Sequence, residues 1–259
     1  MFKKIVICLL FIGLFSTGCN EKKVVQNDLD RIVENEQIIV GVRTDTKPFG
    51  YLDEKGNHAG FDVDLAKMLA DSILNNQDNI KFVDVNSTNR IMKLNSNEVD
   101  IIIATMTVTN NRKHVMDFSI PYHIAGQAIL VNKNSDVTSI GDLKDSRIIV
   151  VYGSTSEQNL RTNLPTVKVI GYRTYEEAYQ ALKENKADAI MADDTLLLDY
   201  VLSNNSVKLL KSRYSTEPYA VGFRKTPESA SLQQKINSQI KFLSDTGKLD
   251  RLREKHEIK

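Results

Sequence analysis

The chain has 259 residues, of which 41% are hydrophobic, with two cysteines and a formal net charge of +1. This length is sufficient for one large domain or two modest ones around a proper hydrophobic core. A nearly neutral charge provides no global attraction to nucleic acid. Basic and acidic residues alternate along the chain, a pattern typical of a solvated surface. Composition therefore indicates a globular protein without a nucleic-acid partner.

The first nineteen residues have the pattern of a bacterial export signal. Lys3 and Lys4 precede an apolar stretch over residues 5–15, and small residues then lead to Cys19. The apolar stretch is too short for a spanning helix, which needs about 20 residues. We therefore expect residues 1–18 to be a lipoprotein signal peptide and Cys19 to be lipidated. The alternatives are an uncleaved anchor or an ordinary secretory signal, because Ser16 stands where lipoproteins of this type usually carry Leu.

Cleavage at this point would change the protein in three ways. The formal net charge would fall to −1, because Lys3 and Lys4 are removed. Cys8 would be lost and Cys19 acylated, so the folded part would have neither a disulfide nor thiolate chemistry. Residues 19–36 would then be the lipidated Cys and a tether, with a short helix expected over residues 28–36 around Leu29, Ile32 and Val33. We expect an extracytoplasmic protein that its lipid anchors to the cell membrane.

Beyond residue 36, short apolar strands alternate with amphipathic helices. We expect strands over residues 38–42, 80–85, 99–104, 147–151, 167–170, 189–192, 207–210 and 219–223. Helices are expected to start at residues 62, 90, 156, 174 and 195, with a long one around residues 232–243. This alternation predicts an α/β fold with largely parallel sheets. It occurs twice, once before about residue 123 and once after it, which predicts two lobes.

Polar side chains follow four of the predicted strands. Open α/β sheets bind ligands beyond the carboxyl ends of their strands. The side chains found there are guanidinium, hydroxyl and carboxylate groups: Arg43, Thr105, Thr107, Arg112, Thr155, Ser156 and Asp193. This set suits a zwitterion, because a guanidinium forks onto a carboxylate and an Asp accepts from an ammonium. The chain shows no nucleophile motif, phosphate loop or metal-ligand spacing, so we expect neither an enzyme nor a cofactor or metal.

Three acids near helix starts have a structural interpretation. Asp62 and Asp64 open one predicted helix, and Asp194 opens another. Carboxylates at these positions cap helices and interact favourably with the helix dipole. We therefore interpret all three as capping residues and assign only Asp193 to a ligand.

Five motifs in chain order carry a specific resemblance. They are GFDVDLA at residues 60–66, VD at 99–100 with residues 107–112 and DFSIPY at 117–122, LK at 143–144 with GST at 153–155, ADA at 187–189 with Asp193, and EPY at 217–219 with FRK at 223–225. Together they resemble the extracytoplasmic solute-binding proteins of polar amino-acid ABC importers, of the family 3 type. The match runs from about Ile38 to Lys255. Lys255-His256 and Asn110-Asn111 depart from the usual Lys-Trp and Pro-Glu.

This resemblance implies a fold and a set of roles. The fold is a two-lobed periplasmic-binding-protein-like one, with two crossover strands, an interlobe cleft and hinge closure. Residues 37–123 plus 218–259 would form lobe 1, and residues 124–217 would form lobe 2. Arg112 would bind the α-carboxylate, with Thr107 and Thr155 in support. Asp193 would bind the α-ammonium with Thr105 nearby, and Ser156 would add a hydroxyl or an N–H. The implied partners are an amino acid and an ABC permease in the membrane, and we expect a monomer.

Arg43 and Arg90 bear on the ligand side chain. They stand where this chain resembles family members that take acidic amino acids, and a buried carboxylate needs its own cation. We therefore expect L-glutamate or L-aspartate. Alternatively, either Arg pairs with a neighbouring acid such as Asp45, and the ligand is L-glutamine or another polar amino acid. A further alternative is a cyclohexadienyl-dehydratase-like enzyme with Glu217 as its acid.

Overall fold

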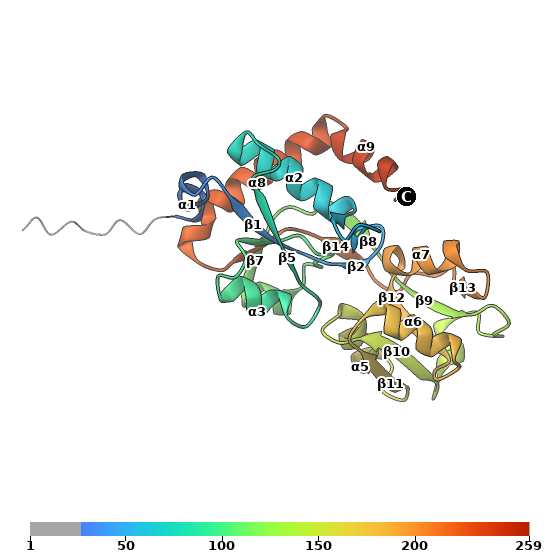
Figure 1. Cartoon of the computed structure of the whole chain (residues 1–259). Coiled ribbons are helices and arrows are strands. Elements are labelled where there is room, and N and C mark those ends of the chain that lie inside the picture. Colours follow the sequence, from blue (N-terminus) through green and yellow to red (C-terminus); the bar gives the residue numbers. More distant parts are fainter. Residues whose placement is uncertain (1–26, 259) are drawn as a thin grey trace, which may run out of the picture.

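The structure is a computed structural model, and it describes residues 27–258. The predicted lipidation site Cys19 and the signal peptide lie outside the described residues. The chain forms two lobes, each built on its own five-stranded sheet (Figure 1). No helix within residues 27–258 is long and apolar enough to cross a membrane.

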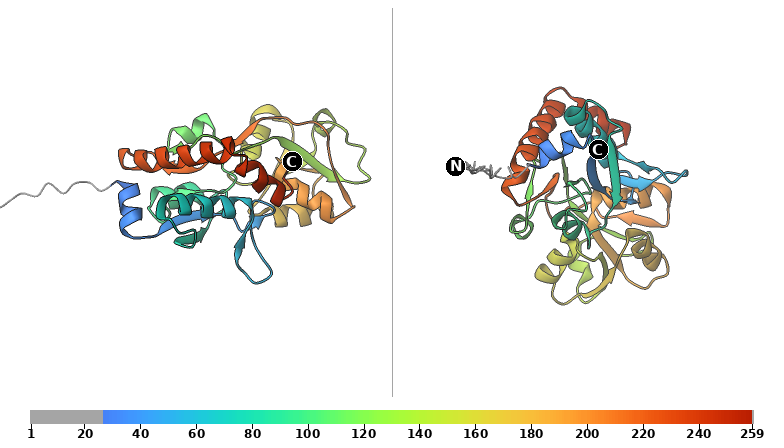
Figure 2. Two further views of the ribbon diagram at one scale, coloured as in Figure 1. Left: turned by 90° about the horizontal axis from the view of Figure 1, so that it is seen from above. Right: turned by 60° about the vertical axis from the view of Figure 1, so that its left-hand side comes forward.

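Lobe 1 has a mixed sheet covered by helices on both faces. Its strands, in spatial order, are β5 (Ile80–Asp84), β1 (Ile38–Val42), β6 (Ile101–Ile102), β15 (Gly222–Arg224) and β7 (Met116–Phe118). Its helices are α1 (Asp28–Glu34), α2 (Phe61–Leu74), α3 (Arg90–Asn95), α4 (Asn110–Lys113), η2 (Pro227–Ser229), α8 (Ala230–Asp245) and α9 (Lys248–Lys255). Although α8 and α9 end the chain, they pack beside α2 on lobe 1 (Figure 2).

Lobe 2 repeats the arrangement with a different chain segment. Its strands, in spatial order, are β11 (Lys168–Tyr172), β10 (Arg147–Val151), β12 (Ala189–Asp193), β9 (Gln127–Asn132) and β13 (Val207–Leu209). Its helices are η1 (Ile140–Leu143), α5 (Thr155–Asn163), α6 (Tyr175–Lys183) and α7 (Asp194–Ser203).

Strand β10 shows why these runs become central strands. Its side chains alternate between two cores, with Ile149 and Val151 in one and Ile148 and Val150 in the other. Both faces of a strand covered by helices must be apolar, so the sequence reads as a continuous apolar run.

Two crossover strands join the lobes. β8 (His123–Ala125) and β14 (Glu217–Tyr219) pair antiparallel, with Glu217 opposite Ala125 and Tyr219 opposite His123. A small sheet of β2 (Asp45–Thr46), β3 (Gly50–Leu52) and β4 (His58–Ala59) extends from lobe 1 beside them. The chain therefore passes between the lobes at two adjacent points.

The structure differs from the sequence-based expectation in several elements. The single strand expected over residues 219–223 is two strands, because Tyr219 pairs in the crossover while Gly222 pairs with Ile102 and Phe118 in lobe 1. The expected strand over residues 99–104 shortens to β6. Both sheets include antiparallel pairs, because β15 and β9 enter from the crossovers, and β9 was not predicted.

The first described helix agrees with the short helix expected over residues 28–36, but it is part of lobe 1 and not of a tether. Residues 28–34 form α1, which is attached to lobe 1 by buried polar contacts. Asp28 pairs with Arg224 at 2.7 Å and accepts a hydrogen bond from Ser229 at 2.6 Å. Arg31 pairs with Asp100 at 2.6 Å. The folded part therefore begins before residue 36.

Candidate ligand-binding site

The carboxyl ends of strands from both lobes meet at one small interlobe cavity. Its lining residues come from both lobes: Ser87, Arg90, Thr105, Thr107, Arg112, Ser154, Thr155, Tyr175, Asp193 and Leu196. Every residue predicted from the sequence to bind ligand lines this cavity, except Arg43 and Ser156. Parallel strands present their carboxyl ends at one edge of a sheet, so two facing sheets bring these residues together.

Arg112 reaches across the gap between the lobes. Its Nη1 donates to the carbonyl of Thr107 at 2.8 Å, within lobe 1. Its Nη2 donates to the carbonyl of Gly153 in lobe 2 at 3.2 Å. Burial lowers the pKa of Arg112, and the charges of Asp193 and Glu217 oppose that shift. The guanidinium remains a cation and can bind an anionic group in the cavity.

Asp193 ends β12 and supplies the negative charge of the cavity. Its Oδ2 accepts a hydrogen bond from the Tyr219 hydroxyl at 2.6 Å. Its Oδ1 is buried and has no hydrogen-bond partner among residues 27–258. Burial, with the nearby charge of Glu217, raises the pKa of Asp193 to about 7. A buried acceptor without a donor is unfavourable, so a ligand ammonium would fill a real deficit here.

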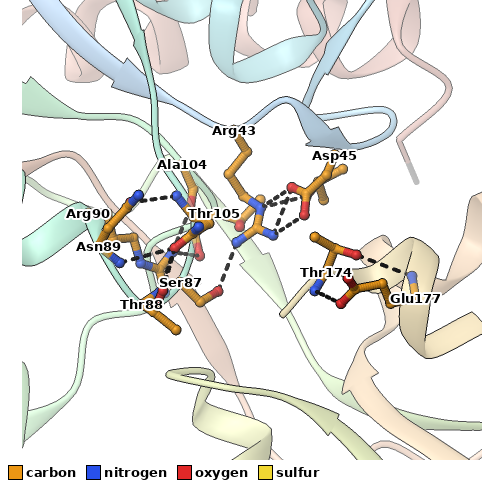
Figure 3. Close-up of polar contacts among 12 residues, drawn as sticks. Arg43, Asp45, Ser87, Thr88, Asn89, Arg90, Ala104, Thr105, Thr174 and Glu177 are labelled. Carbon is orange, nitrogen blue, oxygen red and sulfur yellow. Dashed lines mark hydrogen bonds and ion pairs between the residues drawn. The ribbon is translucent and has the colours of Figure 1, made fainter. Parts of the chain in front are cut away.

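Arg90 and Asp62 flank the backbone at Thr105. Arg90 donates through Nη1 to the carbonyls of Ala104 at 2.6 Å and Thr105 at 3.3 Å, and its Nε is buried without a partner (Figure 3). Burial and the positive charges of Arg112 and Arg43 lower the pKa of Arg90. Thr105 has a positive φ of 46°, which is strained for a β-branched residue. Its amide donates to Asp62 Oδ2 at 2.9 Å, which holds that conformation.

Arg43 is buried but its charge is already paired. Its Nε and Nη2 donate to the two oxygens of Asp45 at 3.0 and 2.9 Å. Nε also donates to Thr46, and Nη1 donates to Ser87 Oγ at 2.8 Å (Figure 3). With only 1% of its surface exposed, Arg43 is held by lobe 1 itself. This is the pairing that the sequence left open as an alternative to a ligand contact.

The remaining predicted residues lie at the start of α5 or beside it. Thr155 accepts a hydrogen bond from Gln127 Nε2 at 3.1 Å and lines the cavity. Thr107 is buried and pairs with Tyr219 through an isolated β-bridge. Ser156 is buried, 1% exposed, and is not part of the cavity lining. Ser154 lines the cavity in its place and caps α5 by accepting from the amide of Glu157.

Sequence reasoning missed four lining residues: Ser87, Ser154, Tyr175 and Leu196. Tyr175 follows β11 and begins α6, so a search of every strand end would have included it. Ser87 and Ser154 were within reach of the same search, because they follow β5 and β10.

Two predicted capping residues have other roles. The cap of α2 is Gly60, and Asp62 accepts hydrogen bonds from the Thr105 amide and the Tyr122 hydroxyl, each at 2.9 Å. The cap position of α7 is Asp193, whose side chain makes no capping bond. Asp194 instead pairs with Arg213 at 2.6 Å and accepts from the amide of Gly126. Tertiary partners therefore replace the local capping interpretation at both positions.

Arginines and carboxylates surround the cavity in similar numbers. Three arginines, Arg43, Arg90 and Arg112, face the carboxylates of Asp45, Asp62 and Asp193, and the charge of Glu217 acts on both Arg112 and Asp193. Burial raises the pKa of Asp62 to about 6, and the positive charges of Arg43 and Arg90 oppose that rise. Asp193, with a pKa of about 7, becomes fully ionised when a cation binds. Within residues 27–258, no cluster of three or more Asp, Glu, His or Cys could hold a metal ion.

A two-lobed α/β chain with a polar cavity between its lobes has the architecture of a solute-binding protein. Residues 38–258 match the family of bacterial extracellular solute-binding proteins, family 3. This chain belongs to that family.

Two sequence relatives and one solved structure illustrate the similarity. The ABC transporter glutamine-binding protein GlnH of Bacillus subtilis is 36% identical over 242 residues, covering 93% of this chain and 88% of the relative. The glutamine-binding protein of Geobacillus stearothermophilus is 41% identical over 201 residues, covering 77% of each. An ancestral arginine-binding protein bound to glutamine superimposes with a TM-score of 0.80 at 37% identity, covering 86% of this chain and 99% of that one. The predicted two-lobed fold is thereby confirmed.

Proposed function

We propose that this protein captures L-glutamine between its lobes and delivers it to an ABC permease. Arg112 binds the α-carboxylate, supported by Thr107 and Thr155. Asp193 binds the α-ammonium through its unpartnered Oδ1, with Thr105 alongside. The fork of a guanidinium and the carboxylate of an Asp fit the two charged groups that every amino acid carries.

The balance of charge around the cavity is the observation that favours glutamine. Arg43 is paired bidentately with Asp45, so it brings no free positive charge to a ligand side chain. The charge of Arg90 acts on the buried carboxylate of Asp62, whose pKa it lowers. Glutamine enters with no net charge, whereas glutamate would add a buried negative charge to a site that already holds the carboxylates of Asp62, Asp193 and Glu217. The acidic ligand expected from the sequence is therefore less well supported than its amide.

The relatives point in the same direction. Two similar proteins are glutamine-binding proteins by name, and a similar structure holds glutamine. These three proteins are binding proteins by name, and none of them is named a dehydratase. We therefore propose a binding protein and not an enzyme.

Calorimetric titration of the purified protein with L-glutamine, L-glutamate, L-aspartate and L-arginine tests the proposal. We expect glutamine to bind most tightly, with a dissociation constant about ten- to a hundredfold lower than that of glutamate. This ratio corresponds to a difference in binding free energy of roughly 1.5–3 kcal/mol, the range for hydrogen bonds to charged groups. Tighter binding of glutamate or aspartate would restore the acidic ligand. An assay for phenylpyruvate or phenylalanine formation tests the enzymatic alternative in the same preparation.

The proposal includes a lipid anchor at Cys19 and a hinge between lobe 1 (residues 37–123 plus 218–259) and lobe 2 (residues 124–217). Cys19→Ala should release the protein from membranes, and mass spectrometry should find lipid on the wild-type Cys19. Unchanged membrane association without such lipid would contradict the anchor. Small-angle scattering of a monomeric sample, with and without glutamine, tests hinge closure.

A further inference from the structure

A cation–π contact joins the two lobes beside the ligand cavity. The Cζ atom of Arg43, in lobe 1, lies 5.3 Å from the ring centroid of Tyr175, in lobe 2. The side chain of Arg43 is essentially buried and Tyr175 is 5% exposed. A guanidinium over an aromatic ring within about 6 Å is attracted by the ring quadrupole, and more strongly where water is excluded.

The guanidinium of Arg43 is fixed before the other lobe meets it. Asp45, Thr46 and Ser87 hold its three nitrogens, and all three belong to lobe 1. β2, which carries Asp45, lies against α6, which begins at Tyr175, and Figure 3 shows the start of this helix facing Asp45. An immobilised planar cation loses little conformational entropy when a ring stacks on it.

Tyr175 is placed with similar definition. It is the first residue of α6, directly after Thr174, which forms a reciprocal capping box with Glu177. The capping bonds fix the start of the helix, so the ring is directed toward Arg43 by the helix and not by a flexible loop.

Ser87, which is bonded to Arg43, contacts lobe 2 at a second residue, Gly153. Its hydroxyl accepts from Arg43, and its carbonyl faces Gly153 so closely that a Cβ on Gly153 would lie 2.6 Å from it. Ser87 and Gly153 therefore form a second contact between the lobes. This contact and the one between Arg43 and Tyr175 depend on the lobes being together, whereas the bonds from Arg43 to Asp45 do not.

We propose that Arg43 and Tyr175 form an interlobe clamp that keeps the lobes closed on the bound ligand. This inference rests on the proposed function and assigns Arg43 to closure instead of to the ligand side chain. Because the contact forms only when the lobes meet, it opposes reopening and has little influence on the first encounter with ligand. The clamp thus sets the lifetime of the complex.

The test measures release of radiolabelled L-glutamine from the purified protein. Equilibrium dialysis gives Kd, and a chase with excess unlabelled glutamine gives koff, so kon follows from their ratio. We expect Tyr175→Leu to raise koff by about three- to thirtyfold, the range of a desolvated cation–π contact, with kon changed by less than about twofold. Tyr175→Phe retains an aromatic ring over Arg43 and should raise koff far less than Tyr175→Leu does.

Tyr179→Leu is the matched control. Tyr179 lies in the same helix, but its ring stacks on Tyr200 within lobe 2, with centroids 4.3 Å apart. Its loss should leave koff close to the wild-type value. In an Arg43→Gln background, Tyr175→Leu should raise koff far less than in the wild type, because the contact is already absent.

Three results would overturn the clamp. They are an unchanged koff in Tyr175→Leu, an equal increase in Tyr179→Leu, and an equal increase in Tyr175→Phe, which would place the hydroxyl on the ligand. Failure of the wild type to retain glutamine would instead refute the proposed ligand. The same chase would then be run with the amino acid that calorimetry identifies, and the clamp would be judged on that ligand. If no amino acid is retained, the clamp is refuted as well.

Discussion

The hydroxyl of Tyr219 donates to Oδ2 of Asp193 at 2.6 Å, which connects the second crossover strand to the ligand cavity. Tyr219 belongs to β14, and Asp193 ends β12 in lobe 2. The hydrogen bond occupies one oxygen of the carboxylate and leaves Oδ1 unpartnered. It also lowers the pKa of Asp193, against the larger effect of burial. Tyr219 therefore influences how readily Asp193 carries the charge that an ammonium needs.

Ligand binding should weaken as the pH falls below about 7. The ammonium pairs with ionised Asp193, whose pKa of about 7 means that protonation competes with the ligand. The affinity should be constant above pH 8 and fall by up to about tenfold per pH unit below pH 7. Calorimetry between pH 5.5 and 8.5, in buffers of different ionisation enthalpy, measures both the affinity and the protons released. A constant affinity over this range would contradict the role of Asp193.

Tyr219→Phe refines the same prediction. The variant keeps the ring against Phe49 and His123 but removes the donor to Asp193. The pKa of Asp193 should rise further, so the loss of affinity should begin at a higher pH than in the wild type. A shift in the opposite direction would mean that the hydroxyl does not stabilise the carboxylate.

Arg112→Ala should abolish binding of every amino acid. The α-carboxylate is common to all candidates, and truncating one partner of such a charge pair costs about 2–5 kcal/mol. The variant also loses the bond to the carbonyl of Gly153 in lobe 2. Lys113→Ala, the exposed next residue of the same helix, is the control and should bind normally. Near-normal titration curves for Arg112→Ala would disprove the assignment of the carboxylate site.

Residues close in sequence were easier to predict than the partners that define the site. The apolar run of β1 and the Thr174–Glu177 capping box depend on neighbouring residues, and both are present in the structure. The orientation of Arg43 depends on Ser87 and Tyr175, which are far along the chain, so its sequence position could not show whether it faces the ligand.

Asp62 illustrates the same limit in a helix. A carboxylate near a helix start indicates a cap when only local chemistry is considered. The Thr105 amide and the Tyr122 hydroxyl reach it only because β6, the following loop and β8 converge on α2. The buried hydrogen bonds outweigh the helix-end interaction, and no local pattern reports them.

Asp45→Asn should shift selectivity toward glutamate. The change removes the carboxylate that neutralises Arg43 and leaves a buried guanidinium with hydroxyl partners and an amide. An added negative charge on the ligand would then meet an unbalanced cation. We expect the ratio of glutamate to glutamine affinity to rise about ten- to a hundredfold, which corresponds to roughly 1.5–3 kcal/mol.

Asp84→Asn is the control for this selectivity change. Asp84 is an exposed acid of the same lobe that pairs with His58, away from the residues that line the cavity. Its substitution should leave the ratio unchanged. If both ligands weaken equally in Asp45→Asn, the Arg43 charge does not reach the ligand, and the balance of charge would not explain the preference.

His123 should make the fold less stable in acid, and His123→Phe should relieve part of that loss. Burial, followed by the charge of Arg253, lowers the pKa of His123 to about 4 from its usual 6.5. Between these values the unfolded chain binds a proton that the folded chain does not, so the free energy of unfolding falls as the pH falls. The difference amounts to about 3 kcal/mol at the acid end.

The substitution should be tolerated because His123 packs as an aromatic ring in the crossover. Its ring lies 5.2 Å from Phe49 and 5.6 Å from Tyr219, and its Nε2 is buried without a hydrogen-bond partner. Urea unfolding at pH 7, 5.5 and 4.5 should show that the variant loses less stability than the wild type over this range. His114→Gln, at an exposed position, should follow the wild type. Parallel losses in His123→Phe and the wild type would show that groups other than His123 control the acid limit of the fold. Asp62 and Asp193 are not among those groups, because burial raises their pKa values and the folded chain therefore binds protons more readily than the unfolded one as the pH falls.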